Sequence, residues 1–237
     1  RHRKLFDQRK WGLVVFDEVH HVPAPIYRRS ADLQTKHRLG LTATPTRESD
    51  DEEEIFTLVG PPIGTDWGKL FDEGYVAEPE VEIRLVPWGT DDERTEYAAT
   101  SGHDRRQAAA GNSGKIDEIR YTLAQHPEAK ALVFVEYLDD GDDISDAIDA
   151  PFISGETRHA ERERLFDAFR RGERDTLVVS RVGDEGIDLP DAELAVVASG
   201  LGGSRRQGAQ RAGRTMRPAG DARMVVLATR GTTEEDF

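Results

Sequence analysis

The sequence predicts an α/β protein built on parallel β-sheets. Short runs of apolar and β-branched residues are typical of strands that are buried on both faces of such a sheet. Helical patterns occur between most of these runs, and this alternation over the 237 residues is typical of parallel sheets covered by helices. The expected core strands are residues 11–16, 37–41, 131–135, 176–179, 194–198 and 224–228, and a further extended run covers 81–86.

Apolar residues at helical spacing predict two helices in the second half of the chain. The spaced apolar residues include Ile116 and Ile119 in 116–124, and Leu165 in 160–169. In 160–169, charged residues lie on the opposite side. Each helix is therefore expected to pack one face on a sheet.

The segment 89–113 is expected to separate two structural units. It is rich in Ala, Gly, Thr, Asp and Arg and has no sustained apolar stripe. We therefore expect a first unit at 1–88, a connecting segment at 89–113 and a second unit at 114–237. The first unit contains only two convincing core strands, fewer than a usual sheet has, so we expect it to be truncated at its N-terminus.

The composition excludes several kinds of site. Cysteine is absent, which excludes disulfides, thiolate zinc sites and cysteine nucleophiles. No apolar run is long enough to span a membrane and no signal peptide is recognisable, so we expect no membrane partner and a cytoplasmic location. The 46 acids, 32 bases and net charge of −14, with Arg more frequent than Lys, resemble the surfaces of proteins from salt-accumulating organisms.

The charge is distributed unevenly along the chain. Its overall sign argues against a nucleic-acid partner, because phosphate binding is driven by clustered cations. Residues 201–220, however, contain five arginines and no acid, so one basic site is embedded in an acidic body. These arginines are Arg205, Arg206, Arg211, Arg214 and Arg217.

Two adjacent carboxylates, Asp17 and Glu18, follow the first expected strand. Open α/β sheets bind ligands at the carboxyl ends of their parallel strands. A pair of this kind can divide the chemistry, since one carboxylate can hold Mg²⁺ through its water shell while the next polarises a water for attack on a phosphoryl group. The alternative is a strand that ends in ordinary turn residues. A zinc site at His20 and His21 is not favoured, because no HExxH spacing is present.

Two further motifs follow expected strands. Thr42 and Thr44 come after the second strand, at the same sheet edge as the two carboxylates, and a Thr-rich strand exit is the alternative. After the strand at 176–179, Gly186 permits a close backbone turn, and Asp188 can accept a hydrogen bond from a ribose hydroxyl or orient an arginine. An ordinary glycine turn is the alternative there.

The segment 210–217 has the pattern QRxGRxxR. Arg214 and Arg217 are three residues apart, so on a helix they share a face and present two planar, permanent cations to one polyphosphate. The alternative is a solvated basic helix, which does not explain an acid-free stretch in so acidic a chain.

Taken in order, the motifs DEVHH, LTATP, VGDEGIDLP and QRAGRTMRP resemble motifs II, III, V and VI of superfamily 2 helicases. DEVHHVPA, GLTATPT and GGSRRQGAQRAGRTMR are similar to the versions found in XPB-type DNA helicases, and the likeness covers most of residues 11–230. The resemblance implies two RecA-like lobes, the first truncated at its N-terminus, with ATP in the cleft and DNA across the top. It also implies that 89–113 is an inter-lobe linker or a shortened thumb.

The resemblance assigns roles to residues at matching positions. It implies that Asp17 holds Mg²⁺ through water, that Glu18 activates the attacking water, and that Arg214 and Arg217 contact the γ-phosphate. Further nucleotide-side positions are Gly186, Asp188 and Gln210, and the positions that couple the nucleotide site to DNA are His20, Thr42 and Thr44.

The sequence departs from the family pattern at three places. No GxxxxGK[ST] loop is present, since the Gly-Lys pairs at 68–69 and 114–115 lack the upstream Gly and the following hydroxyl. Residues 47–49 read Arg-Glu-Ser where the family has Arg-Glu-Asp, and 89–113 is short for a full thumb. We therefore expect these 237 residues alone to bind ATP poorly and to be inactive.

The function expected from the resemblance is that of an ATP-dependent DNA helicase or translocase, using ATP and Mg²⁺ and acting in DNA repair or transcription with proteins of those processes. One alternative is a non-catalytic DNA-binding or scaffold module derived from a helicase. Another is a restriction-type or remodelling translocase that moves on duplex DNA. Intact Asp17, Glu18, Arg214 and Arg217 favour an enzyme over a scaffold.

Overall fold

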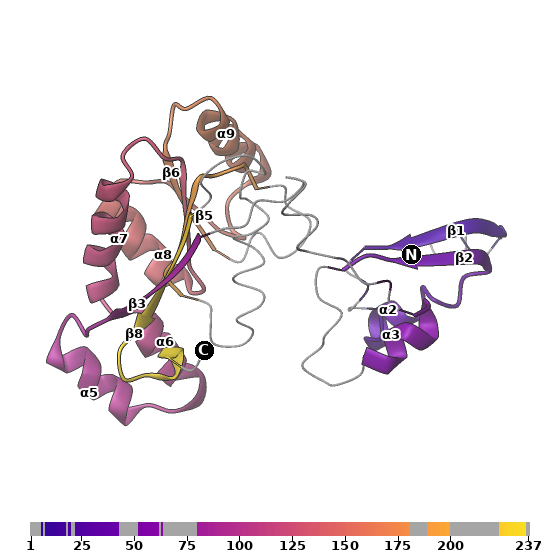
Figure 1. Ribbon diagram of the computed structural model, residues 1–237, viewed down its shortest axis with the longest axis horizontal. Helices are drawn as coiled ribbons and strands as arrows, with labels where there is room; N and C mark the ends of the chain where they lie inside the picture. Colours follow the sequence, from indigo (N-terminus) through magenta and orange to yellow (C-terminus); the bar gives the residue numbers. More distant parts are fainter. Residues whose placement is uncertain are drawn as a thin grey trace. The chain divides into compact units, whose positions relative to one another are not determined.

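The computed structural model divides the chain into two compact units, Arg1–Asp66 and Trp67–Phe237. Figure 1 shows the helices and strands of both units, and each unit has its own sheet. Among the described residues, no helix has both the length and the apolar composition that a membrane span needs. The structure describes Phe6, residues 8–17, Val19, and residues 22–42, 52–61, 63, 80–180, 189–199 and 223–235.

The first unit contains a pair of parallel strands, β1 (Trp11–Phe16) and β2 (Thr35–Gly40). Helices α2 (Pro25–Arg28) and α3 (Glu52–Leu58) accompany them (Figure 1). The small core on one face of the strand pair consists of Phe16, Val19, Val22, Ala31 and Ile55.

The second unit contains six parallel strands in the order β3-β8-β7-β4-β6-β5. The inner strands are almost entirely buried, as their continuous apolar runs predict. The predicted parallel α/β class is therefore confirmed. The strands are β3 (Glu80–Val86), β4 (Ala131–Phe134), β5 (Phe152–Ile153), β6 (Thr176–Val179), β7 (Leu194–Val197) and β8 (Arg223–Thr229).

Helices cover both faces of this sheet (Figure 1). The helices α7 (Gly114–Gln125) and α8 (Leu138–Ile148) pack on one face, where Ile119 and Ile144 join the core. Helix α9 (His159–Arg170) packs on the other through Leu165, Phe166 and Phe169. The two helices expected from apolar spacing, at 116–124 and 160–169, lie within α7 and α9.

Residues 80–113 differ from the sequence-based expectation. The extended run 81–86, which we expected in the first unit, forms β3 and pairs with β8 in the second sheet. The segment 89–113, expected as a connecting segment with no sustained apolar stripe, forms helices α5 (Asp91–Ala99) and α6 (Gly102–Ala110). A capping box at Thr90 and Glu93 starts α5 without any apolar stripe.

Aromatic contacts hold these two helices together. The rings of Trp88 and Tyr97 lie 5.3 Å apart between centroids, and the Arg105 guanidinium of α6 lies 4.4 Å from the centroid of Tyr97 in α5. A cation above an aromatic face is attracted by the ring electrons. The α5–α6 hairpin is therefore stabilised by a few specific contacts that periodicity does not reveal. The short 3₁₀ helix η3 (Thr233–Glu235) follows β8.

Candidate functional site

The carboxyl ends of β1 and β2 bring two predicted site residues to one sheet edge. Phe16 and Gly40 are paired in register, and the Leu41 amide donates to the Phe16 carbonyl at 2.8 Å. Asp17 follows Phe16 and is exposed, whereas Thr42, two residues beyond the end of β2, is half-buried. The structure therefore places Asp17 and Thr42 as the strand pattern predicts.

The exposed carboxylate of Asp17 suits Mg²⁺ bound through water. Mg²⁺ keeps several of its waters and commonly takes one or two protein carboxylates. Within the described part of the chain, no group of three His, Asp or Glu side chains is close enough to bind a metal directly. The exposed Asp17 thus fits the role of a carboxylate that holds a hydrated ion.

Eight of the predicted site residues lie outside the described residues. They are Glu18, His20, Thr44, Gly186, Asp188, Gln210, Arg214 and Arg217. The strands that precede them are nevertheless described. Gly186 and Asp188 follow β6 in the chain, and the arginine motif lies between β7 and β8.

The strands that come before these motifs in the chain, β6 and β7, lie on either side of β4 in the second sheet. Strand β4 lies between β6 and β7. The next two strands in the chain, β5 and β6, lie on one side of β4, and the chain then crosses to β7 on the other side. Open parallel sheets bind ligands outside the carboxyl ends of their strands where the order reverses in this way. The two motifs follow the strands on either side of this reversal. The sequence pattern indicated both strands but not their order.

A buried ion pair at this edge was not predicted from the sequence. The Lys115 ammonium donates to Oε1 and Oε2 of Glu234 at 3.0 and 2.8 Å, and to the carbonyl of Ala198 at 2.9 Å. The Thr229 amide donates to the same Glu234 carboxylate at 2.8 Å. In the sequence, the Gly114-Lys115 pair resembles only an incomplete phosphate loop. Its partner Glu234 is distant in sequence, so no local signal reveals the pair.

The Asn112 amide group links three chain segments beside this pair. Its Nδ2 donates to the Pro87 carbonyl at 3.0 Å and to the Thr229 hydroxyl at 3.2 Å. Its Oδ1 accepts from the amides of Gly89 at 2.9 Å and Gly114 at 3.0 Å. Both N–H donors and both acceptor positions of the Asn112 amide group are thus used, which fixes the orientation of this side chain.

The α5–α6 hairpin is attached to the same edge. The Thr229 hydroxyl donates to the Ala109 carbonyl of α6 at 2.7 Å. The Thr233 amide of η3 donates to the Tyr97 hydroxyl of α5 at 3.2 Å. These bonds connect the hairpin to the carboxyl end of β8, the strand that follows the arginine motif in the chain, and to η3.

Asp140 of α8 lies in this region with an altered acidity. Burial raises its pKa to about 7, although the nearby Lys115 ammonium acts in the opposite direction. Its Oδ2 is buried and has no hydrogen-bond partner among the described residues. Asp140, Asn112 and Lys115 line a cavity of about 140 Å³.

Comparison with known sequence families identifies two matching regions. The sequence model of the ERCC3/RAD25/XPB C-terminal helicase family matches residues 70–229, which is more than half of the chain. The model of the Type III restriction enzyme res subunit matches residues 1–47.

Individual proteins give a consistent result. The chain is similar to the putative DNA 3'-5' helicase Rad25 of Haloarcula marismortui, with 87% identity over 100% of this chain and 38% of that protein. It is also similar to the DNA 3'-5' helicase XPB of Mycobacterium tuberculosis, with 48% identity over 93% of this chain and 40% of that protein. The chain therefore spans about two fifths of the length of these relatives.

A solved structure supports the fold. The Pyrococcus furiosus Hef helicase domain superposes with a TM-score of 0.57 and 18% identity, over 99% of this chain and 75% of that chain. This likeness agrees with the predicted RecA-like α/β class. Given the family match over residues 70–229, the chain belongs to the ERCC3/RAD25/XPB C-terminal helicase family.

Proposed function

We propose that this chain is the part of an ATP-dependent DNA helicase or translocase that couples ATP hydrolysis to movement on DNA. The proposal rests on the family match over residues 70–229, together with Asp17 beside Thr42 at the carboxyl edge of β1 and β2. The names of the relatives, DNA 3'-5' helicase Rad25 and XPB, support it.

The proposed partners are DNA and proteins of transcription or DNA repair. A zebrafish relative, 33% identical over 88% of this chain, is named a general transcription and DNA repair factor IIH helicase/translocase subunit XPB. That name supports a role in these processes. It also agrees with the translocase part of the proposal.

Four residues would do the chemistry at the nucleotide. When bound, ATP supplies the phosphoryl group, and Mg²⁺ offsets its negative charge. Asp17 would hold the ion through water, and the Glu18 carboxylate would orient the attacking water and accept its proton. Arg214 and Arg217 would bind oxygens of the γ-phosphate and stabilise the charge that develops there.

The other predicted positions would bind the nucleotide or transmit its state. We propose Gly186, Asp188 and Gln210 as nucleotide-side residues. His20, Thr42 and Thr44 would couple the nucleotide site to DNA, and these six assignments rest on the motif match alone.

The chain would supply two RecA-like lobes. We propose that the motifs of the first lobe lie within 1–88 and those of the second within 114–237, and that the α5–α6 hairpin, within 89–113, is the shortened thumb. The pairing of β3 with β8 places the physical start of the second sheet before that hairpin. Because the 237 residues contain no GxxxxGK[ST] loop, we expect them not to hydrolyse ATP by themselves.

A roadblock assay on the complete natural protein tests this function. The protein is mixed with duplex DNA that carries a bound third strand, and ATP-dependent release of that strand is measured together with ATP hydrolysis. A translocase releases the third strand only with ATP. DNA binding without hydrolysis or release would instead support the scaffold alternative. The restriction-type alternative has a narrower basis, since that family matches only residues 1–47.

A further inference from the structure

The Lys115–Glu234 ion pair lies outside the proposed nucleotide chemistry, yet it is among the most buried polar features described. Lys115 is 1% exposed and Glu234 is 8% exposed. Two charges removed from water lose hydration that their mutual attraction does not always replace, so apolar pairs of similar size are often as stable. Stability alone therefore gives little reason for this pair.

The third acceptor of the Lys115 ammonium indicates a more specific role. This acceptor is the carbonyl of Ala198, at 2.9 Å. Ala198 directly follows β7, and its own amide donates to the Phe134 carbonyl at the end of β4, at 2.9 Å. The next residue, Ser199, accepts a hydrogen bond from the Glu136 amide at its hydroxyl, at 2.8 Å. The exit of β7 is thus held by β4 on one side and by Lys115 on the other.

Glu234 fixes the position of the ammonium. Its carboxylate is held by the Thr229 amide at the end of β8, at 2.8 Å. Lys115 itself belongs to the first turn of α7. One ammonium therefore connects the start of a helix with the carboxyl ends of two neighbouring strands.

We infer that Lys115 is a positioning residue for the arginine motif. By holding the Ala198 carbonyl, it sets where the chain leaves β7 on its way to Gln210, Arg214 and Arg217. This inference rests on the proposed function. Catalytic groups that are displaced by about 1 Å lose about 100-fold in rate, so a fixed starting point for this segment matters for catalysis.

A pair of variants separates positioning from stability. Lys115→Met alone leaves the Glu234 carboxylate buried and unpaired, which destabilises the protein. The double variant Lys115→Met/Glu234→Gln removes both charges, and the Gln carbonyl still accepts from the Thr229 amide. Stability should recover in the double variant, whereas the Ala198 carbonyl still lacks its donor.

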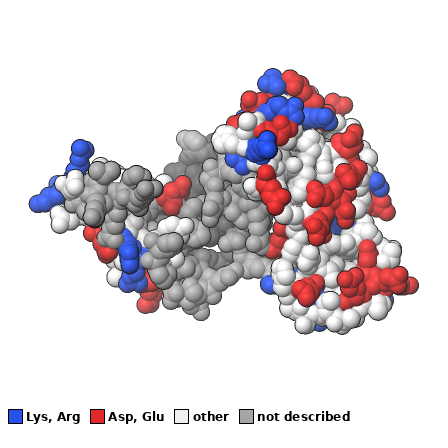
Figure 2. Space-filling model, turned by 180° about the vertical axis from the view of Figure 1, so that it is seen from behind, with Lys and Arg blue, Asp and Glu red and all other residues white. Residues whose placement is uncertain are grey.

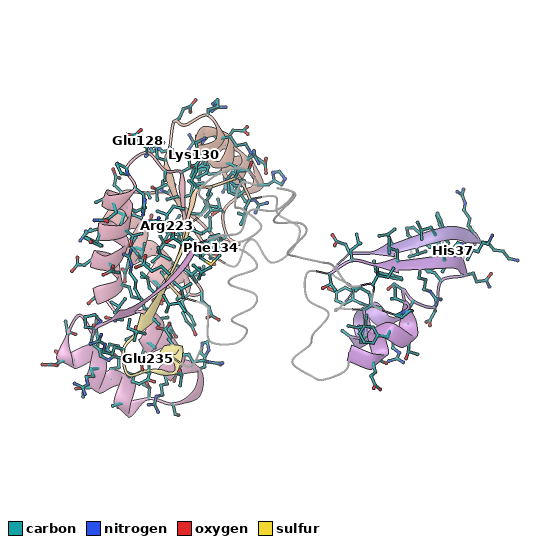
Figure 3. All side chains as sticks on the ribbon, in the orientation of Figure 1. His37, Glu128, Lys130, Phe134, Arg223 and Glu235 are labelled. Carbon is teal, nitrogen blue, oxygen red and sulfur yellow. The ribbon has the colours of Figure 1, made fainter. Side chains whose placement is uncertain are left out.

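A second lysine provides the matched control. Lys130 also donates its ammonium to a backbone carbonyl, that of Arg170, at 2.8 Å. It lies at the amino end of β4, and Figure 3 shows it at the opposite end of the sheet from Glu235, the neighbour of Glu234. Lys130→Met therefore removes the same kind of hydrogen bond without touching the exit of β7.

Two measurements on the complete natural protein test the inference. The first is hydrogen exchange of the Ala198 and Ser199 amides, which should be about tenfold faster in the double variant than in the wild type or Lys130→Met. The second is DNA-stimulated ATP hydrolysis. The kcat of the double variant should fall at least about tenfold while its KM for ATP stays within about twofold, because the arginines act in the transition state.

Either of two results would overturn the inference. One is unchanged amide exchange at Ala198 and Ser199 in the double variant. The other is a kcat that recovers together with stability, which assigns the pair a purely structural role. If the wild type hydrolyses no ATP, the proposed function fails, and the exchange experiment alone still decides whether Lys115 holds the exit of β7.

Discussion

The backbone of Gly40 in β2 lies so close to the side chain of Val19 that a Cβ added at Gly40 would be 2.8 Å from Cγ2 of Val19. The amide of Val19 donates to the carbonyl of Leu41 at 2.9 Å, which folds the chain after β1 across the end of β2. A side chain at position 40 would push this crossing outward. The glycine therefore helps to place Asp17 and its neighbours at the carboxyl edge.

The first prediction follows from this close approach. Gly40→Ala should destabilise the first unit by about 1–3 kcal/mol, the usual effect of an added methyl group in a packed site. The measurement is the free energy of unfolding by denaturant titration. Gly12→Ala is the matched control, because a Cβ at Gly12 of the neighbouring strand β1 meets nothing within 4 Å. Equal stability of the two variants would show that Val19 does not need the glycine.

The second prediction concerns Asp140 and pH. Burial raises its pKa to about 7, so the folded protein favours the neutral carboxyl. For an acid with a raised pKa, the stabilising contribution is fully present below the unfolded-state pKa of about 4. It is lost as the pH rises towards 7, where the folded protein must bury a charge.

Asp140→Asn should therefore stabilise the chain more at pH 8 than at pH 5. The measurement is the unfolding midpoint of variant and wild type at both pH values. Asp146→Asn is the control, since Asp146 is exposed on the same helix α8. A difference between Asp140→Asn and the wild type that is the same at both pH values would contradict the assigned pKa.

The third prediction concerns salt. The net charge is −14, and Figure 2 shows acidic side chains spread over the visible face of the second unit. Like charges repel in the folded state, and salt screens this repulsion over about 10 Å at 0.1 M and about 3 Å at 1 M. At pH 8, the unfolding midpoint should therefore rise when KCl is increased from about 0.1 M to about 1 M.

The same titration near pH 5 is the control for this effect. The sequence pI is about 5.0, so the net repulsion is small at that pH and the salt effect should shrink. A midpoint that does not change with KCl at pH 8 would refute the interpretation of the acidic surface.

The inner strands of the second sheet could be predicted because each is a short apolar run that is buried on both faces. Strand β6, for example, has the predicted limits 176–179. The two-residue strand β5 is too short to give such a run and was not predicted. Helix α8 was missed because its aspartates dominate the composition. Leu138, Gly141 and Ile144 nevertheless lie three residues apart, and the acids of its first turn complement the helix dipole.

The candidate site was predictable only where it depends on strand ends. Asp17 and Thr42 lie at the same sheet edge because the parallel strands before them end there together, as the sequence order suggests. The bonds of Lys115 to Glu234 and of Asn112 to Thr229 join residues more than a hundred positions apart. No periodic pattern in the sequence predicts a contact between residues so far apart, so only the folded structure reveals these pairs.

In the proposed function, Glu18 activates water for ATP hydrolysis on DNA. This role is tested by DNA-stimulated ATP hydrolysis of the complete natural protein with Glu18→Gln, alongside Glu128→Gln at an exposed position (Figure 3). We predict a fall of at least about 100-fold for Glu18→Gln, with DNA binding and the unfolding midpoint unchanged, and no loss for Glu128→Gln. A Glu18→Gln variant that hydrolyses ATP at the wild-type rate would contradict the proposed mechanism.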